Sequence, residues 1–193
     1  MSGELGVGDR VNESTLAEKF GVSRGPIREA CRSLEQAGLL VASANHGSYV
    51  REMSLQEACD LYEVRGVLFG LVGHLAVQRC SDENIDDLVT LVTQMDASVA
   101  AHDFDKYYAQ NLAFHNTMVQ AAGNKSLSEN YNSIIKQLHL FRRRGLVSAG
   151  SLEVSNAEHW VIVDALKARD SDATEHAMRR HVAGGWARMS ATI

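Results

Sequence analysis

Apolar and polar positions follow two different patterns along the chain, and the pattern changes near residue 53. Before that point the apolar runs are short and are separated by glycine and small polar residues. After it, apolar residues recur every three to four positions over long stretches, the spacing of helices that bury one face. The pattern therefore predicts two domains, residues 1–52 and residues 53–193.

The first domain is predicted to contain two short helices and a β-hairpin. One helix begins near Asn12 and ends at Gly21, and the next begins at Ser23 and ends at Gly38, because Asn and Ser cap helix starts and Gly favours helix ends. The stretch LLVASANHGSYV, residues 39–50, has two β-like runs around an Asn-His-Gly turn. Helix, tight turn, helix and hairpin is the order of a winged helix-turn-helix domain.

The second domain is predicted to be an all-α antiparallel bundle. Ser followed three residues later by Glu, the capping-box pattern, occurs at Ser54, Ser126 and Ser155. The single proline is Pro26, and no β-rich alternation follows residue 51. The fold class is therefore mainly α, with a small hairpin wing in the first domain. The six helices expected in the bundle are 54–79, 82–102, 104–122, 126–147, 154–168 and 171–190.

Composition favours a globular cytoplasmic protein. The 193 residues are 45% hydrophobic, which is enough to bury a core. No apolar run approaches the roughly 18 residues that a membrane-spanning helix needs, and the first ten residues lack the apolar centre of a signal peptide. Cys31, Cys59 and Cys80 have no C-x-x-C spacing and fall in apolar helical stretches, as buried reduced thiols do.

The net charge of −5 is unevenly distributed. Residues 1–51 carry six Lys or Arg and six Asp or Glu, so the whole deficit lies in residues 52–193. If the protein binds a polyanion, the first domain binds it. There, Arg24, Arg28 and Arg32 share one face of the second helix. That face suits guanine recognition in a DNA groove, and it equally suits a solvated surface with intrahelical glutamate partners.

The stretch LAEKFGVSRGPIREACRSLEQAGLLVASANHGSYV resembles the DNA-binding domain of the GntR family of bacterial transcriptional regulators. The resemblance covers about residues 8–51. It implies contacts in the DNA major groove from Ser23, Arg24, Gly25, Pro26 and Arg28. It also implies that the wing tip, His46 and Gly47, contacts the minor groove or the DNA backbone. An exposed turn histidine is an equal alternative for His46, and Gly47 also suits a backbone turn with positive φ.

Two features depart from this family pattern. Family members carry a further helix ahead of the stretch GELGVGDRV, residues 3–11, and this chain starts almost at that stretch, so an incomplete DNA-binding domain is expected. Ser14 also stands where some members have a phosphate-binding Arg, which predicts weaker binding to DNA.

Residues 54–190 resemble the FadR-type effector domain, often called FCD, at LYEVRGVL, NLAFHNTMVQAAGN, AEHWVIVDALKARD and AMRRHV. That family commonly holds a divalent metal with one Asp and three His. The resemblance assigns these positions to Asn111, His115, His159 and His181. The spacing also brings one His from each of three helices and sets Asn111 one turn from His115. Packing histidines without a metal are the alternative.

Imidazole ligands favour a transition metal, and zinc or nickel is expected. Asn111 carries no charge and binds such a metal less tightly than the usual Asp. We therefore expect a site that either needs bound effector to hold its metal or uses its polar groups directly. The missing negative charge favours an acidic ligand.

The resemblance also implies an effector contact at Arg65, whose guanidinium suits a carboxylate. An ion pair with Glu63 or with a helix neighbour is the alternative. His139 is a second candidate for effector binding, and Arg142 and Arg143 on the same helix are alternatives that could add polar groups. Phe69 stands where family members frequently have Glu. The three consecutive arginines 142–144 favour a solvated or dimer-facing stripe.

Together these features predict a homodimeric transcriptional repressor that reads palindromic operator DNA. Its second domain is expected to bind a small carboxylate effector with a divalent metal. One alternative is a ligand- or metal-binding bundle with a degenerate DNA-binding arm. A metal-dependent hydrolase is another, but the chain lacks H-E-x-x-H, a nucleophile elbow and a phosphate-binding loop, so no enzymatic activity is expected.

Overall fold

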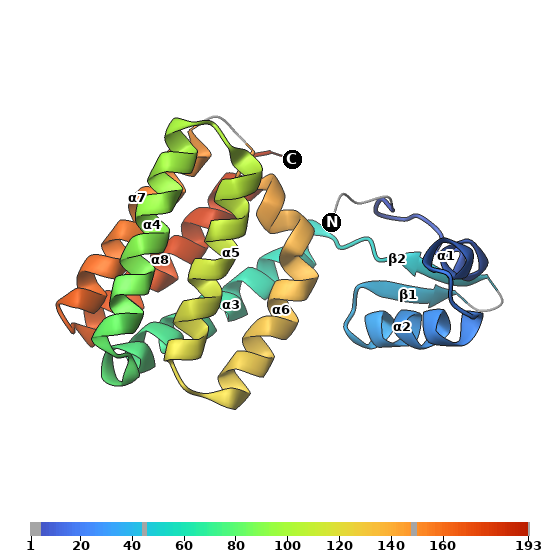
Figure 1. The fold of residues 1–193 in the computed structure, drawn as a ribbon, viewed down its shortest axis with the longest axis horizontal. Coiled ribbons are helices and arrows are strands. Elements are labelled where there is room, and N and C mark those ends of the chain that lie inside the picture. The colour runs from blue at the N-terminus through green and yellow to red at the C-terminus, as the bar shows by residue number, and fades with distance from the viewer. Residues whose placement is uncertain (1–4, 44–45, 148–149, 193) are drawn as a thin grey trace. The chain divides into compact units, whose positions relative to one another are not determined.

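The computed structural model describes residues 5–43, 46–147 and 150–192, and the chain forms two compact units, residues 1–54 and 55–193 (Figure 1). The described residues form helices and one small two-stranded antiparallel sheet, so the predicted fold class is confirmed. The predicted boundary, between residues 52 and 53, falls two residues before the division between the units.

The first unit contains two helices followed by the hairpin. These elements are α1 (Glu13–Phe20), α2 (Arg24–Gln36), β1 (Leu40–Ser43) and β2 (Gly47–Val50). The Asn12 side chain accepts hydrogen bonds from two backbone N–H groups at the start of α1, and Gly21 ends that helix in the left-handed conformation, with φ of 66°. In the sheet, Leu40 pairs with Val50. A small core fixes the helices on the hairpin: Val11, Ala17, Ile27, Cys31 and Leu40.

The second unit is a bundle of helices. They are α3 (Leu55–Arg79), α4 (Asp82–Ala100), α5 (Phe104–Ala121), α6 (Lys125–Arg144), α7 (Ser151–Lys167) and α8 (Ser171–Ser190). The long helix α3 packs along α8 and also contacts α5 and α6, while α4 lies against α5 and α7 (Figure 1). This packing brings α5, α6, α7 and α8 to a common interior, where polar side chains meet.

The capping boxes predicted at Ser126 and Ser155 are wrong. Helix α6 begins at Lys125, and the Asn124 side chain accepts a hydrogen bond from the N–H of Leu127 at 3.1 Å. Helix α7 begins at Ser151, three residues before the predicted start. Both serines therefore lie inside helices, and Ser155 is available for another role.

The structure also bears on the expectations for the cysteines and for membrane-spanning helices. The three thiols are free, with Cys31 and Cys80 buried as expected, whereas Cys59 is partly exposed. Within the described ranges, every helix is too short or too polar to serve as a membrane span.

Candidate functional site

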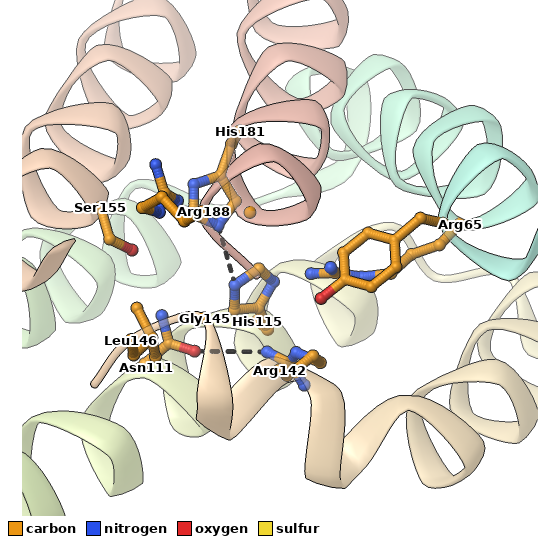
Figure 2. A pocket seen from close by; sticks show the side chains of 11 residues that line it. Arg65, Asn111, His115, Arg142, Gly145, Leu146, Ser155, His181 and Arg188 are labelled. Carbon is orange, nitrogen blue, oxygen red and sulfur yellow. Dashed lines mark hydrogen bonds between the residues drawn. The ribbon is translucent and has the colours of Figure 1, made fainter. Parts of the chain in front are cut away.

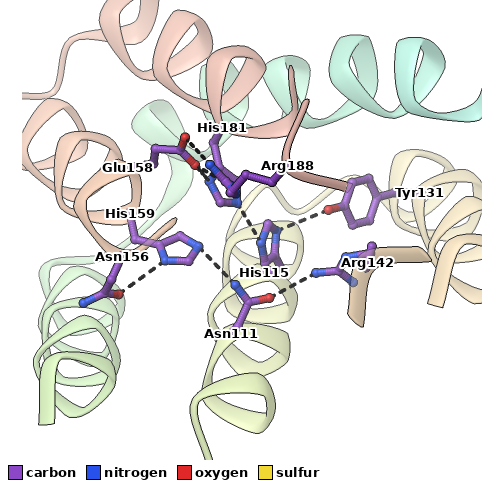
Figure 3. A network of polar contacts seen from close by, with 9 residues as sticks. All are labelled: Asn111, His115, Tyr131, Arg142, Asn156, Glu158, His159, His181 and Arg188. Atoms are coloured by element: carbon purple, nitrogen blue, oxygen red, sulfur yellow. Dashed lines mark hydrogen bonds and ion pairs between the residues drawn. The ribbon is translucent and has the colours of Figure 1, made fainter. Parts of the chain in front are cut away.

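Three histidines from three helices converge inside the second unit: His115 on α5, His159 on α7 and His181 on α8 (Figure 3). None is more than 5% exposed, and one ring nitrogen from each lies within 4.8 Å of the others. The Nε2 atoms of His115 and His181 are 3.2 Å apart. Two nitrogens bound to one tetrahedral zinc ion lie roughly 3.3 Å apart, so this pair has the spacing of metal ligands.

The other ring nitrogen of each histidine faces a polar partner (Figure 3). The three contacts are His181 Nδ1 to Glu158 Oε2 at 2.8 Å, His159 Nδ1 to Asn156 Oδ1 at 3.4 Å, and His115 Nδ1 to the Tyr131 hydroxyl at 3.4 Å. Such partners fix the tautomer of a metal-binding histidine and turn its remaining nitrogen toward the ion. The donor set therefore fits a divalent transition metal.

Burial keeps the three imidazoles neutral. Desolvation is the largest cause that lowers the pKa of His115 and of His159 well below the usual value, and it also lowers the pKa of His181. At His115 the positive charge of Arg142 acts in the same direction. Because neutral imidazole is the form that binds metal, the triad needs to release no proton.

Asn111 lies one turn before His115 on α5 and is 3% exposed. Its Nδ2 lies 3.4 Å from Nε2 of His159, and its Oδ1 accepts a hydrogen bond from Nη2 of Arg142 at 3.2 Å. The oxygen is the amide atom that suits a metal. It is already engaged by a guanidinium, so a metal at this position competes with Arg142 for it.

A cavity of about 30 Å³ opens beside the triad (Figure 2). Its wall includes His115, His181 and three arginines: Arg65 from α3, Arg142 from α6 and Arg188 from α8. A space of this size holds about two water molecules. It therefore admits a metal ion or a few ligand atoms.

Arg65, the predicted effector contact, lies in the cavity wall and is 3% exposed. Its guanidinium carbon is 5.4 Å from the centre of the Tyr62 ring, and its Nε is buried without a hydrogen-bond partner. The alternative ion pair, with Glu63 or with a helix neighbour, is not found among the described residues. The side chain is thus placed to receive an anion.

Two expectations for α6 have different outcomes. Arg142 is 7% exposed and lines the cavity, so the prediction that it belongs to a solvated or dimer-facing stripe is wrong. The side chains of Arg143 and Arg144 lie outside the described residues. His139 is exposed, its Nδ1 lies 3.1 Å from the Tyr108 hydroxyl, and it is absent from the described cavity wall.

Several residues of the site were missed by sequence reasoning. Glu158 contacts Nδ1 of His181, and it accepts two hydrogen bonds from Arg188 at 2.7 and 2.9 Å. Arg188 follows His181 by seven residues, two helical turns, and that spacing could have revealed it. Phe69, noted from the sequence only as standing where family members frequently have Glu, is fully buried. Its ring centre lies 4.8 Å from that of His115, so it closes an apolar side of the triad.

The residues predicted to contact DNA are all exposed in the first unit: Ser23, Arg24, Gly25, Pro26, Arg28, His46 and Gly47. Ser23 caps α2 but makes no side-chain capping bond. The side chains of Arg24 and Arg28 are 62% and 54% exposed, and both approach the Glu13 carboxylate, at 3.8 and 3.4 Å. Gly47 has φ of 87°, which explains a glycine at the wing turn.

Comparison with known families adds to this geometry. Residues 60–184 match the model of the FCD domain, and residues 1–50 match that of the bacterial regulatory proteins of the gntR family. The chain belongs to the GntR family. Its resemblance to regulators with an FCD effector domain is thereby confirmed, and this GntR-family protein is a transcriptional regulator, not an enzyme.

Relatives support the same family over nearly the whole chain. A protein of Paenarthrobacter nicotinovorans named "Probable D-xylose utilization operon transcriptional repressor" is 30% identical, with 94% of this chain and 79% of that protein covered. The Nta operon transcriptional regulator of Aminobacter aminovorans is also 30% identical, covering 91% and 81%. The structure of E. coli McbR/YncC shares the fold, with a TM-score of 0.87 at 20% identity over 98% of this chain and 91% of that one.

Proposed function

We propose that this GntR-family regulator is a repressor that binds palindromic operator DNA as a homodimer. We further propose that a small carboxylate and a divalent metal bind in the FCD cavity and change the affinity for the operator. The main support is the interior of the FCD domain, where three convergent neutral histidines lie beside a cavity whose wall contains Arg65, a buried arginine with no acidic partner among the described residues. One relative named above is itself called a transcriptional repressor.

The first unit would supply the DNA contacts. Arg24 and Arg28 are exposed near the start of α2, where a guanidinium can bind a guanine edge with two hydrogen bonds. Backbone N–H groups at the same helix end, together with Ser23, suit a phosphate. Two such helices in a symmetric dimer, about 34 Å apart, would read the two halves of a palindrome.

The second unit would supply the ligand site. His115, His159 and His181 would hold zinc or nickel, with Asn111 as a weaker fourth contact. A bound metal would offer a concentrated positive charge to an acid. Arg65 would contact the carboxylate, and Glu158 would hold His181 in its orientation.

The test uses the purified full chain after removal of metal with a chelator. Zinc or nickel at saturation is expected to raise the melting temperature of the wild type and to leave His159→Ala unchanged, because the variant lacks one of three ligands. Operator fragments are found by footprinting DNA upstream of the regulated genes, and fluorescence anisotropy then measures their affinity with and without metal and acid. If neither zinc nor nickel changes the melting temperature of the wild type, the proposed metal site is refuted.

A further inference from the structure

Two buried guanidiniums in the cavity wall have no acidic partner among the residues that the structure describes. Arg65 is 3% exposed and Arg142 is 7% exposed. Arg65 contacts the face of Tyr62, and Arg142 donates to the neutral amide of Asn111. Arg65 Nε and Arg142 Nη1 are buried donors that lack a hydrogen-bond partner within the described ranges. A buried ion without a counter-ion is strongly destabilising, so this pair of charges favours an anionic ligand.

The third arginine of the wall, Arg188, does have an acidic partner. Arg188 makes two hydrogen bonds with Glu158, and the same carboxylate also contacts His181. Glu158 is therefore already shared by two partners. Among the described residues of the cavity wall none is Asp or Glu. With the histidines neutral, three arginines and one carboxylate leave two positive charges at the site.

The two unpaired charges lie close enough to affect one another. Burial, followed by the positive charge of Arg65, lowers the pKa of Arg142. Arg65 comes from α3 and Arg142 from α6, and Figure 2 shows both side chains directed toward the space beside His115. An anion between them would relieve their repulsion and meet donors from both sides.

We propose that Arg65 and Arg142 together bind a compact oxyanion with two negative charges, and that this binding needs no metal. The inference rests on the proposed function in one respect, that the FCD cavity binds an acid. Arg142 already donates to the Asn111 oxygen, and it brings a fixed cation to the end of the triad where a metal contact is weakest. A small dicarboxylate and inorganic phosphate share the required chemistry. The cavity of about 30 Å³ favours the smallest members of that class.

Isothermal titration calorimetry of the full chain at pH 8 in excess chelator tests this proposal. The probes are malonate and inorganic phosphate as dianions and acetate as a monoanion of similar chemistry, all at one ionic strength. At least one dianion is expected to bind about tenfold or more tightly than acetate. Whichever dianion binds more tightly identifies the source, a dicarboxylate or a phosphate.

Variants locate the effect. Arg142→Gln is expected to remove the preference for the dianion while still binding acetate through Arg65. Arg142→Lys keeps the charge and is expected to keep part of the preference. Arg180→Gln removes an exposed arginine outside this cavity wall and should change nothing, which controls for net charge. If a cavity variant fails to fold, the comparison of dianion and acetate binding to the wild type still tests the proposal.

The outcomes separate this inference from the proposed function. Equal affinity for acetate and the dianions, or dianion binding that appears only after zinc is added, would overturn the inference. The proposed function survives either result if zinc still raises the melting temperature. If neither zinc nor any of the three acids binds the wild type, both proposals fail.

Discussion

Arg24 and Arg28 of the first unit and Arg65 and Arg142 of the second unit carry the same guanidinium group in opposite surroundings. The first pair is more than half exposed and lies near the Glu13 carboxylate. The second pair is less than a tenth exposed and has no carboxylate partner in the described part of the chain. A solvated guanidinium has no desolvation penalty, whereas a buried one has a penalty of several kcal/mol. The exposed pair is therefore neutral for stability, and the buried pair lowers it.

This difference separates two ways in which binding residues affect a fold. A residue that contacts DNA from an exposed helix start can be exchanged with little effect on folding. A charged residue that binds a ligand inside a bundle destabilises the ligand-free protein. Binding of the ligand then raises the free energy of unfolding again. The two pairs should therefore respond differently to substitution.

The largest contrast is expected from Arg65→Met. Replacing a buried charge that lacks a counter-ion by an apolar side chain of similar length should raise the free energy of unfolding of the ligand-free chain by about 1–4 kcal/mol. Urea unfolding followed by circular dichroism measures the change. The matched exposed variant, Arg24→Met, should stay within about 0.5 kcal/mol of the wild type. A loss of stability in Arg65→Met would mean that the guanidinium already has its stabilising partners.

The next effect concerns the metal. Zinc at about 100 times its dissociation constant should add about 2.7 kcal/mol to the stability of the wild type and nothing to that of His159→Ala. Differential scanning calorimetry with and without zinc measures both. Asn111→Asp should bind zinc more tightly than the wild type, because it supplies a charged oxygen donor. A response to zinc in Asn111→Asp alone would show that Asn111 has abolished metal binding in this chain.

The exposed arginines should matter for DNA only. Arg24→Ala or Arg28→Ala is expected to weaken operator binding by about 1–3 kcal/mol where the contact is to a base. Fluorescence anisotropy at fixed salt measures the affinity, and an unchanged melting temperature serves as the control. Losses below a few tenths of a kcal/mol in both variants would remove α2 from the DNA interface.

The smallest effect is expected at Glu13. Its ion pairs with Arg24 and Arg28 are largely solvated, and such pairs contribute about 0–1 kcal/mol. Glu13→Gln removes a negative charge beside both arginines, so it should tighten DNA binding by less than about tenfold and change the free energy of unfolding by less than about 1 kcal/mol. Weaker binding in this variant would indicate that Glu13 holds the arginines in their DNA-binding geometry.

Local sequence signals predicted the parts of the fold that depend on local chemistry. Helix α1 begins after Asn12 and ends at Gly21 as expected, because a helix cap depends on a few neighbouring backbone groups. The capping box predicted at Ser155 was wrong because it, too, was read from local sequence alone. Ser-x-x-Glu has the same spacing inside a helix as at its start, and here Ser155 lines the cavity while Glu158 pairs with Arg188. Only packing distinguishes the two cases.

Some residues of the candidate site were identified from the sequence, and others depend on packing. Asn111 and the three histidines were found from their motifs and from the family resemblance. For Arg142 the sequence favoured a solvated stripe over a place in the effector site, because three consecutive arginines occur on both solvated and buried helix faces. Which of the three points inward depends on how α6 packs on α3 and α8, a property of the folded bundle.

The central claim is that a ligand in the FCD cavity controls DNA binding by the first unit. It is tested most directly by anisotropy titrations of operator DNA with the chelated full chain, with and without zinc and malonate at saturation. Binding linkage requires that the DNA change the affinity for the cavity ligand by the same factor. We predict a change in operator affinity of about fivefold or more in the wild type and none in a chain carrying both His159→Ala and Arg142→Gln. Identical affinities of the wild type in all conditions would contradict the claim.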